Sequence, residues 1–347
     1  MQLALLPSSG VLAVRQQGTR RRLLTLSLAC GLLSLAAILS VTFGTRDVAW
    51  PDIARALSGQ SDTIGAAAVS ARLPRTALAM LAGAGLALAG TALQGVTRNP
   101  LADPGILGIN AGAALAVVVM LAWGSLETGA AYALTASLGA ALAAGLVQAI
   151  ASMGRGRATP LKLALAGAAT SAALASFTTA IILPRNDIAG LAQSWQIGGV
   201  GGATWAQITP VLPFFALGIA LVMLNARRLN LLALGEETAS GLGENVQIAR
   251  GLAVLGAILL CGAATATCGP IGFVGLVVPH LMRALIGVDY RWLIPASALV
   301  GAALLTGADV AGRLIARPAE LDVGILTAFL GAPVFIWIVR RRKLGAL

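Results

Sequence analysis

Few residues in this chain could take part in chemistry. The chain holds a single histidine, His280, and three cysteines, Cys30, Cys261 and Cys268, which lie in apolar runs without the spacing of metal ligands. No glycine-rich loop in the sequence ends in Gly-Lys-Ser or Gly-Lys-Thr, the phosphate-binding motif of P-loop ATPases. These features argue against a histidine-based metal site or proton relay. They predict a chain with no catalytic residue and no cofactor of its own.

The charged residues suggest contacts between proteins rather than catalysis. The acidic residues fall near the ends of apolar runs or in the connections between them: Asp103, Glu127, Asp187, Asp289, Asp309, Glu320 and Asp322. Asp309 and Arg313 are one helical turn apart, a spacing that predicts an ion pair. A carrier driven by protons or sodium needs a carboxylate on its path through the membrane, and none of these positions is a good candidate. We therefore expect the driving force to come from a partner.

The elements that position these residues are expected to be transmembrane helices. The chain is 58% apolar and 11% charged, whereas soluble proteins carry about 25% charged residues. Several apolar runs reach the roughly 20 residues that cross a bilayer as helix, and the 42 glycines allow helices to approach closely. We expect an all-α polytopic protein with ten spans, near residues 23–43, 76–96, 106–123, 130–152, 161–183, 208–225, 248–267, 271–288, 292–311 and 323–339.

The positive residues indicate an orientation. With the N-terminus in the cytoplasm, most of the 24 Lys and Arg residues fall on the inner side, as is usual in membrane proteins. The net charge of +11 is then a matter of topology and does not indicate nucleic-acid binding. Residues 1–22 would form a cytoplasmic segment and 23–347 a single transmembrane domain with its end inside. The first apolar run is too long for a cleaved signal peptide.

A polar segment at 226–247 interrupts the apolar second half of the chain. It opens with two arginines, continues with a stretch rich in helix formers that contains Glu236 and Glu237, and is broken by glycines up to Gly243. This pattern predicts a short amphipathic helix on the cytoplasmic side that a soluble partner could hold. A plain connection between two spans is the alternative.

Several motifs, in one order along the chain, resemble the permease subunits of ABC importers for ferric siderophores, haem and cobalamin, the FecCD-type or type II importers. The resemblance covers almost the whole chain from about residue 25 and implies ten transmembrane helices per subunit, two permease subunits and two ATPases. The motifs are RLPR at 72–75, QGVTRNPLADPGILG at 94–108, LGEE at 234–237 with LG at 242–243, GPIGFVGLVVPH at 269–280 with Arg283, and LGAP at 330–333.

The resemblance also implies roles for particular residues. Coupling to the ATPase falls on Leu234, Gly235, Glu236, Glu237, Leu242 and Gly243, with Glu236 as the first charged contact to test. Docking of an acidic periplasmic or lipoprotein binding protein falls on Arg72, Arg75 and Arg313. A pathway at the dimer axis would be lined by Thr159, Ser171, Ser176, Thr178 and Thr179, with Arg185 and Gln196 near its outer end. The alternatives are ordinary outer-face charges and hydroxyls that bond to their own helix.

The function that the resemblance implies is that of a permease subunit in a bacterial inner membrane, which passes an iron chelate inward by alternating access. A ferric siderophore is favoured over haem or cobalamin. The expected partners are a second permease, taken to be an identical copy, two ATPases that bind ATP and Mg, the substrate-binding protein and membrane lipid, without nucleic acid. A stand-alone secondary carrier and a membrane enzyme are the alternatives from other classes.

Overall fold

The computed structural model describes residues 8–100, 102–105, 107–124, 128–153 and 160–344, and within them the chain forms helices and no strands. Seven stretches are long and apolar enough to cross a membrane. They comprise α1 (Ser8–Thr42), α3 (Ile64–Thr97), α5 (Gly129–Ser152), α6 (Pro160–Ile182), α8 to α9 (Trp205–Ile208 and Leu212–Leu224, joined by a 3-10 turn at Thr209–Val211), α12 (Val246–Cys268) and α14 (Tyr290–Ile315).

Three shorter apolar helices and four further helices complete the fold. The shorter apolar helices are α4 (Ile109–Trp123), α13 (Val274–Ile286) and α15 (Val323–Leu344). The others are α2 (Trp50–Leu57), α7 (Asn186–Ile197), α10 (Ala226–Ala233) and α11 (Glu236–Gly241). The all-helical prediction is confirmed, and the long and short apolar helices together occupy the positions of the expected spans. The number of membrane crossings stays a prediction.

Helix α3 is the centre of the bundle. It packs against α12, α13 and α14, and nearly every residue between positions 82 and 95 is buried. Glycine permits these close contacts: a Cβ at Gly83 would overlap the carbonyl of Gly301 on α14, and one at Gly90 would overlap that of Gly275 on α13. Backbone-to-backbone packing of small residues is how membrane helices associate without a hydrophobic drive between them.

Helix α3 also begins earlier than the sequence suggested. We expected a span that starts near residue 76, whereas the helix starts at Ile64. The hydroxyl of Thr63 caps it by accepting from the backbone N–H of Ala66 at 3.1 Å. Arg72 and Arg75 therefore project from a helix, rather than from a loop.

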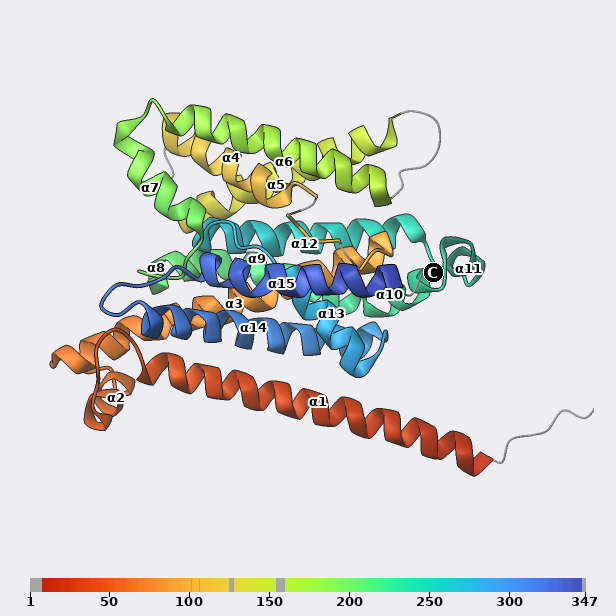
Figure 1. Ribbon diagram of the computed structural model, residues 1–347, viewed down its shortest axis with the longest axis horizontal. Coiled ribbons are helices and arrows are strands. Elements are labelled where there is room, and N and C mark those ends of the chain that lie inside the picture. The colour runs from red at the N-terminus through yellow and green to blue at the C-terminus, as the bar shows by residue number, and fades with distance from the viewer. Residues whose placement is uncertain (1–7, 101, 106, 125–127, 154–159, 345–347) are drawn as a thin grey trace, which may run out of the picture.

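Short helices lie at both ends of the bundle. Figure 1 shows α2, α7 and α8 at one end, and α11 with the C-terminus at the opposite end. Helix α1 packs along α14 at one edge of the bundle, while α4, α5 and α6 pack on one another at the other edge. The predicted orientation makes the first end the outer one and the second the cytoplasmic one, and these terms are used below.

Candidate functional site

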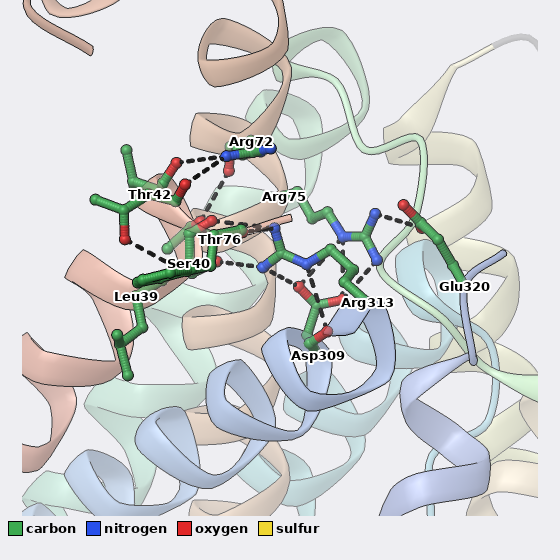
Figure 2. Close-up of polar contacts among 11 residues, drawn as sticks. Leu39, Ser40, Thr42, Arg72, Arg75, Thr76, Asp309, Arg313 and Glu320 are labelled. Carbon is green, nitrogen blue, oxygen red and sulfur yellow. Dashed lines mark hydrogen bonds and ion pairs between the residues drawn. The ribbon is translucent and has the colours of Figure 1, made fainter. Parts of the chain in front are cut away.

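A buried carboxylate, Asp309 of α14, lies between two arginines near the outer end (Figure 2). Arg75 of α3 donates from Nη2 to Asp309 Oδ1 at 2.7 Å, and Arg313 Nη2 lies 2.8 Å from Oδ2. The Asp309 and Arg313 side chains are only 2% exposed. A charge is tolerated at such a position when it is paired and hydrogen-bonded. The ion pair predicted from the spacing of Asp309 and Arg313 is confirmed, and Arg75 joins α3 to it.

The carbonyl end of α1 is held by Arg313 and by a third arginine, Arg72. Arg313 Nη1 donates to the carbonyls of Ser40 at 3.0 Å and Phe43 at 3.1 Å. Arg72 donates to three carbonyls within 41–46 at 2.6 to 3.1 Å. The last carbonyls of a helix have no partner in their own helix, so guanidinium groups are well suited to this position. We call Arg72, Arg75, Asp309, Arg313 and Glu320 the outer cluster.

Glu320 is the accessible edge of the outer cluster. It lies in the link between α14 and α15, and its carboxylate accepts from Arg75 Nη1 at 2.7 Å. Its side chain is 40% exposed, compared with 2% for Asp309. A pocket of about 530 Å³ opens beside this pair, and its lining includes Arg46, Arg72, Arg75, Arg313, Glu320 and Trp205. Because arginines outnumber carboxylates there, the pocket is suited to a carboxylate from another molecule.

The structure thus brings together the three arginines that were predicted to meet a binding protein. Arg72 and Arg313 are largely occupied by internal acceptors, whereas Arg75 reaches the exposed Glu320. Their docking role stays a prediction. Sequence reasoning missed the partnership of Arg75 with Asp309 and Glu320, because those residues lie more than 230 positions away and no local spacing links them.

The predicted coupling segment at 226–247 forms α10 and α11 at the cytoplasmic end (Figure 1). Gly235 precedes α11 with φ 115° and Gly243 follows it with φ 83°, conformations that favour glycine. Leu234 and Leu242, on either side of α11, are each 61% exposed. The glycines therefore fix a short acidic helix with a leucine at each end.

Two ion pairs hold α11 against its neighbours. Glu236 pairs with Arg250, in the first turns of α12. Arg228 of α10 lies 3.4 Å from Glu244, which follows α11. Glu236, the first charged contact suggested by the sequence, thus has a partner inside this chain.

The hydroxyls predicted to line a pathway lie on α6. Ser176, Thr178 and Thr179 each donate to a carbonyl one turn earlier, at 2.8 to 3.0 Å, as Ser and Thr often do in membrane helices. Ser176 and Thr179 are exposed on this helix, whereas Thr178 is buried. Ser171 donates to a carbonyl of the α3–α4 link at 3.3 Å. Ser176 and Thr179 therefore lie on the exposed face of α6.

The other predicted pathway residues lie near the outer end. Arg185 pairs with Asp187 at 2.8 Å and donates to the carbonyl of Ala122 at 2.8 Å. The hydrogen-bonded pair raises the pKa of Arg185 and lowers the pKa of Asp187. Gln196 is half-buried on α7. Thr159 lies outside the described residues.

A second carboxylate, that of the partly buried Asp103, lies in the α3–α4 link. Its Oδ2 accepts from the backbone N–H of Gly105 at 2.9 Å, and Gly275 of α13 packs beside it. Burial raises the pKa of Asp103 to about 6. The sequence did not indicate this raised pKa.

Comparison with known proteins agrees with this geometry. The FecCD transport family matches residues 32–341. The iron(3+)-hydroxamate import system permease protein FhuB of Bacillus subtilis is 40% identical over 316 residues, which are 90% of this chain and 82% of that protein. The hemin transport system permease protein HmuU of Yersinia pestis is 42% identical over 282 residues, 78% of this chain and 82% of that protein.

A solved structure shows the same arrangement of helices. A metal-chelate type ABC transporter in an inward-facing conformation superposes with a TM-score of 0.77 at 29% identity, over 92% of this chain and 99% of that chain. The family match spans most of the sequence, and the similarity to the two permeases extends well beyond single motifs. The chain belongs to the FecCD transport family.

Proposed function

We propose that this chain is the permease subunit of an ATP-driven importer that moves an iron chelate across the bacterial inner membrane. The relatives FhuB and HmuU are permeases for iron-hydroxamate and hemin. A ferric siderophore is favoured, with haem as the alternative and cobalamin as a more distant one. The observation that supports the proposal is that a pocket rich in arginine lies at one end of a bundle of apolar helices and a short acidic helix flanked by exposed leucines lies at the other.

The outer surface receives the substrate-binding protein. The pocket beside Arg75 and Glu320 has an excess of arginine, and arginine pairs with carboxylates in a two-pronged geometry. A positive rim also speeds the encounter with an acidic partner and orients it. We therefore assign the acidic side of the contact to the binding protein.

The inner surface receives the ATPase. The segment α10–α11 presents two exposed leucines and an acidic short helix, and the sequence has no phosphate-binding loop of its own. ATP and Mg would bind to the partner subunit. Hydrolysis there would move α11. The permease itself would perform no chemistry.

Helix α14 provides a rigid link between the two surfaces. At its start, Asn230 of α10 donates to Asp289 at 2.8 Å and accepts from the N–H of Tyr290 at 2.9 Å. Near its other end it carries Asp309 and Arg313. At 1.5 Å per residue its 26 residues extend about 39 Å. A displacement of α10 would therefore reach the outer cluster through one continuous helix.

The assembly proposed is two copies of this chain with two ATPases and one binding protein. The open face of α6, which carries Ser176 and Thr179, adjoins the axis between the two copies and the path of the chelate. Large apolar side chains exposed on α1 and α5 would face lipid. Both chain ends would lie in the cytoplasm.

The test is uptake into liposomes that contain the permease with its co-purified ATPase. The binding protein is loaded in turn with a ferric siderophore, haem or cobalamin, with ATP or a non-hydrolysable analogue inside. We expect one ligand to accumulate only when ATP and the loaded binding protein are both present. Uptake that ignores both would instead identify a secondary carrier and would overturn the proposal.

A further inference from the structure

We propose that Glu237 is the carboxylate that meets a basic side chain of the ATPase, and that Glu236 and Arg250 form an internal ion pair that positions α11 for this contact. The assignment rests on the proposed function, since it takes the ATPase as the partner at this end. It separates two adjacent glutamates that the sequence alone does not distinguish.

Glu236 faces back towards its own subunit. Its carboxylate pairs with Arg250 Nη2, and the two side chains are 41% and 34% exposed. Arg250 lies in the first turns of α12, which packs against α3 and α9 in the core. The ion pair therefore fixes the start of α11 to a helix that is itself anchored in the bundle.

Glu237 faces away from the subunit. Successive residues of a helix point about 100° apart, so two adjacent glutamates cannot face the same neighbour. Glu237 and the next residue, Thr238, are exposed, while Ala239 is buried on the inner side. Within the part of the chain that the structure describes, no cation forms an ion pair with Glu237. Its carboxylate is available to a partner.

The chemistry of the partner follows from the neighbours of Glu237. Leu234 and Leu242 are both 61% exposed and flank the short helix. Such residues gain most when they are buried in an apolar groove, and a carboxylate at the edge of the groove needs a cation. The surface of the ATPase would therefore offer an apolar groove with a lysine or arginine beside it.

A charge exchange within the permease tests the positioning role. Glu236→Arg and Arg250→Glu, each alone, place like charges together and should reduce ATP hydrolysis that depends on the loaded binding protein. The double variant restores an ion pair of reversed polarity, and we expect hydrolysis to return to within about twofold of wild type, since each partly exposed pair is worth only about 1 kcal/mol or less. A contact of Glu236 with the ATPase would leave the double variant as defective as Glu236→Arg.

The adjacent glutamate is the matched comparison. Glu237→Arg should weaken the binding of the ATPase by about tenfold or more, because like charges facing each other across an interface cost several kcal/mol. Pairing it with Arg250→Glu should not rescue it. Affinity is measured by titrating the purified ATPase onto the permease in nanodiscs, and thermal unfolding of each variant verifies that it is folded.

The outcomes separate the inference from the proposed function. If Glu237→Arg binds the ATPase as wild type does, or the double exchange fails to restore hydrolysis in a folded permease, the assignment of the two glutamates is wrong. If the wild-type permease binds no ATPase at all, the proposed function fails instead.

Discussion

The proposed docking of an acidic partner at the outer cluster predicts that replacing Glu320 by glutamine tightens the complex with the binding protein. Glu320 holds Arg75 Nη1 at 2.7 Å and stands at the edge of the pocket. A carboxylate of the binding protein that reaches Arg75 must displace it. Glutamine has nearly the same shape but no charge. It should therefore bind Arg75 less tightly, and the carboxylate of the binding protein should displace it more easily.

The size of the effect follows from the exposure of the pair. The Arg75 side chain is 12% exposed and that of Glu320 is 40% exposed. Exposed ion pairs are worth about 0.2–1 kcal/mol, and hydrogen bonds to charged groups about 1.5–3 kcal/mol. For this half-exposed contact we take about 1 kcal/mol, which corresponds to roughly a fivefold tighter complex.

The assay is a titration of the purified binding protein onto the permease–ATPase complex in nanodiscs, at physiological salt and without nucleotide. Asp62→Asn is the matched control, because it removes one exposed carboxylate from the segment that leads into α3. The twelve residues from Thr63, the cap of α3, to Arg75 extend about 18 Å at 1.5 Å per residue. Charges at that ionic strength are screened beyond about 8 Å, so we expect the control to remain within about twofold of wild type.

Two results would refute the reasoning. A weaker complex with Glu320→Gln would mean that Glu320 itself attracts the partner. An increase of the same size with Asp62→Asn would mean that the gain comes only from the general charge of the outer face.

Three further predictions concern stability. Asp309→Asn leaves two arginines without their carboxylate and should lower the free energy of unfolding in detergent by about 3–5 kcal/mol, whereas Asp187→Asn, at an exposed pair, should change it little. The pKa of Asp103 is about 6 in the folded protein against 3.8 for the free group. Its contribution to stability should therefore grow as the pH falls from about 6 towards 4 and disappear as the pH rises through 6. Asp103→Asn should abolish this dependence of stability on pH, and an unchanged dependence would contradict its assignment to Asp103. Gly90→Ala forces a methyl group against a backbone carbonyl and should cost about 1–3 kcal/mol, while Gly251→Ala, where a Cβ meets nothing within 4 Å, should be neutral or stabilising.

The fold class could be predicted because helices that cross a lipid bilayer require long apolar runs, and such runs are visible in the sequence. A segment that crosses lipid must satisfy its backbone internally and carry about 20 apolar residues, so composition alone places most helices. The start of α3 could not be placed in this way. Arg72 and Arg75 precede the apolar run and mark its expected start, yet they lie within the helix because α1 carbonyls and Asp309 compensate their charges.

For the sites too, features set by neighbouring residues could be predicted from the sequence, whereas contacts between separate segments could not. Gly235 and Gly243 flank α11 at positions where the backbone turns, so this part of the predicted coupling segment could be located from the sequence. The partner of Glu236 could not be predicted, since Arg250 lies 14 residues further on, in the next helix. The three arginines predicted to dock a binding protein were proposed from the resemblance, whereas Glu320, their exposed neighbour, came only from the structure.

The contact between α1 and α14 sets a time scale for the synthesis of this protein. Arg313 donates to the carbonyl of Phe43, 270 residues earlier in the chain. At about 5–20 residues per second, the end of the first helix is made roughly 14 to 54 s before its partner emerges from the ribosome. Water at the membrane surface must bind these carbonyls during that interval. The end of α1 can meet Arg72 of α3 after 26 to 31 further residues, whereas its contact with Arg313 forms only after most of the described chain has been made.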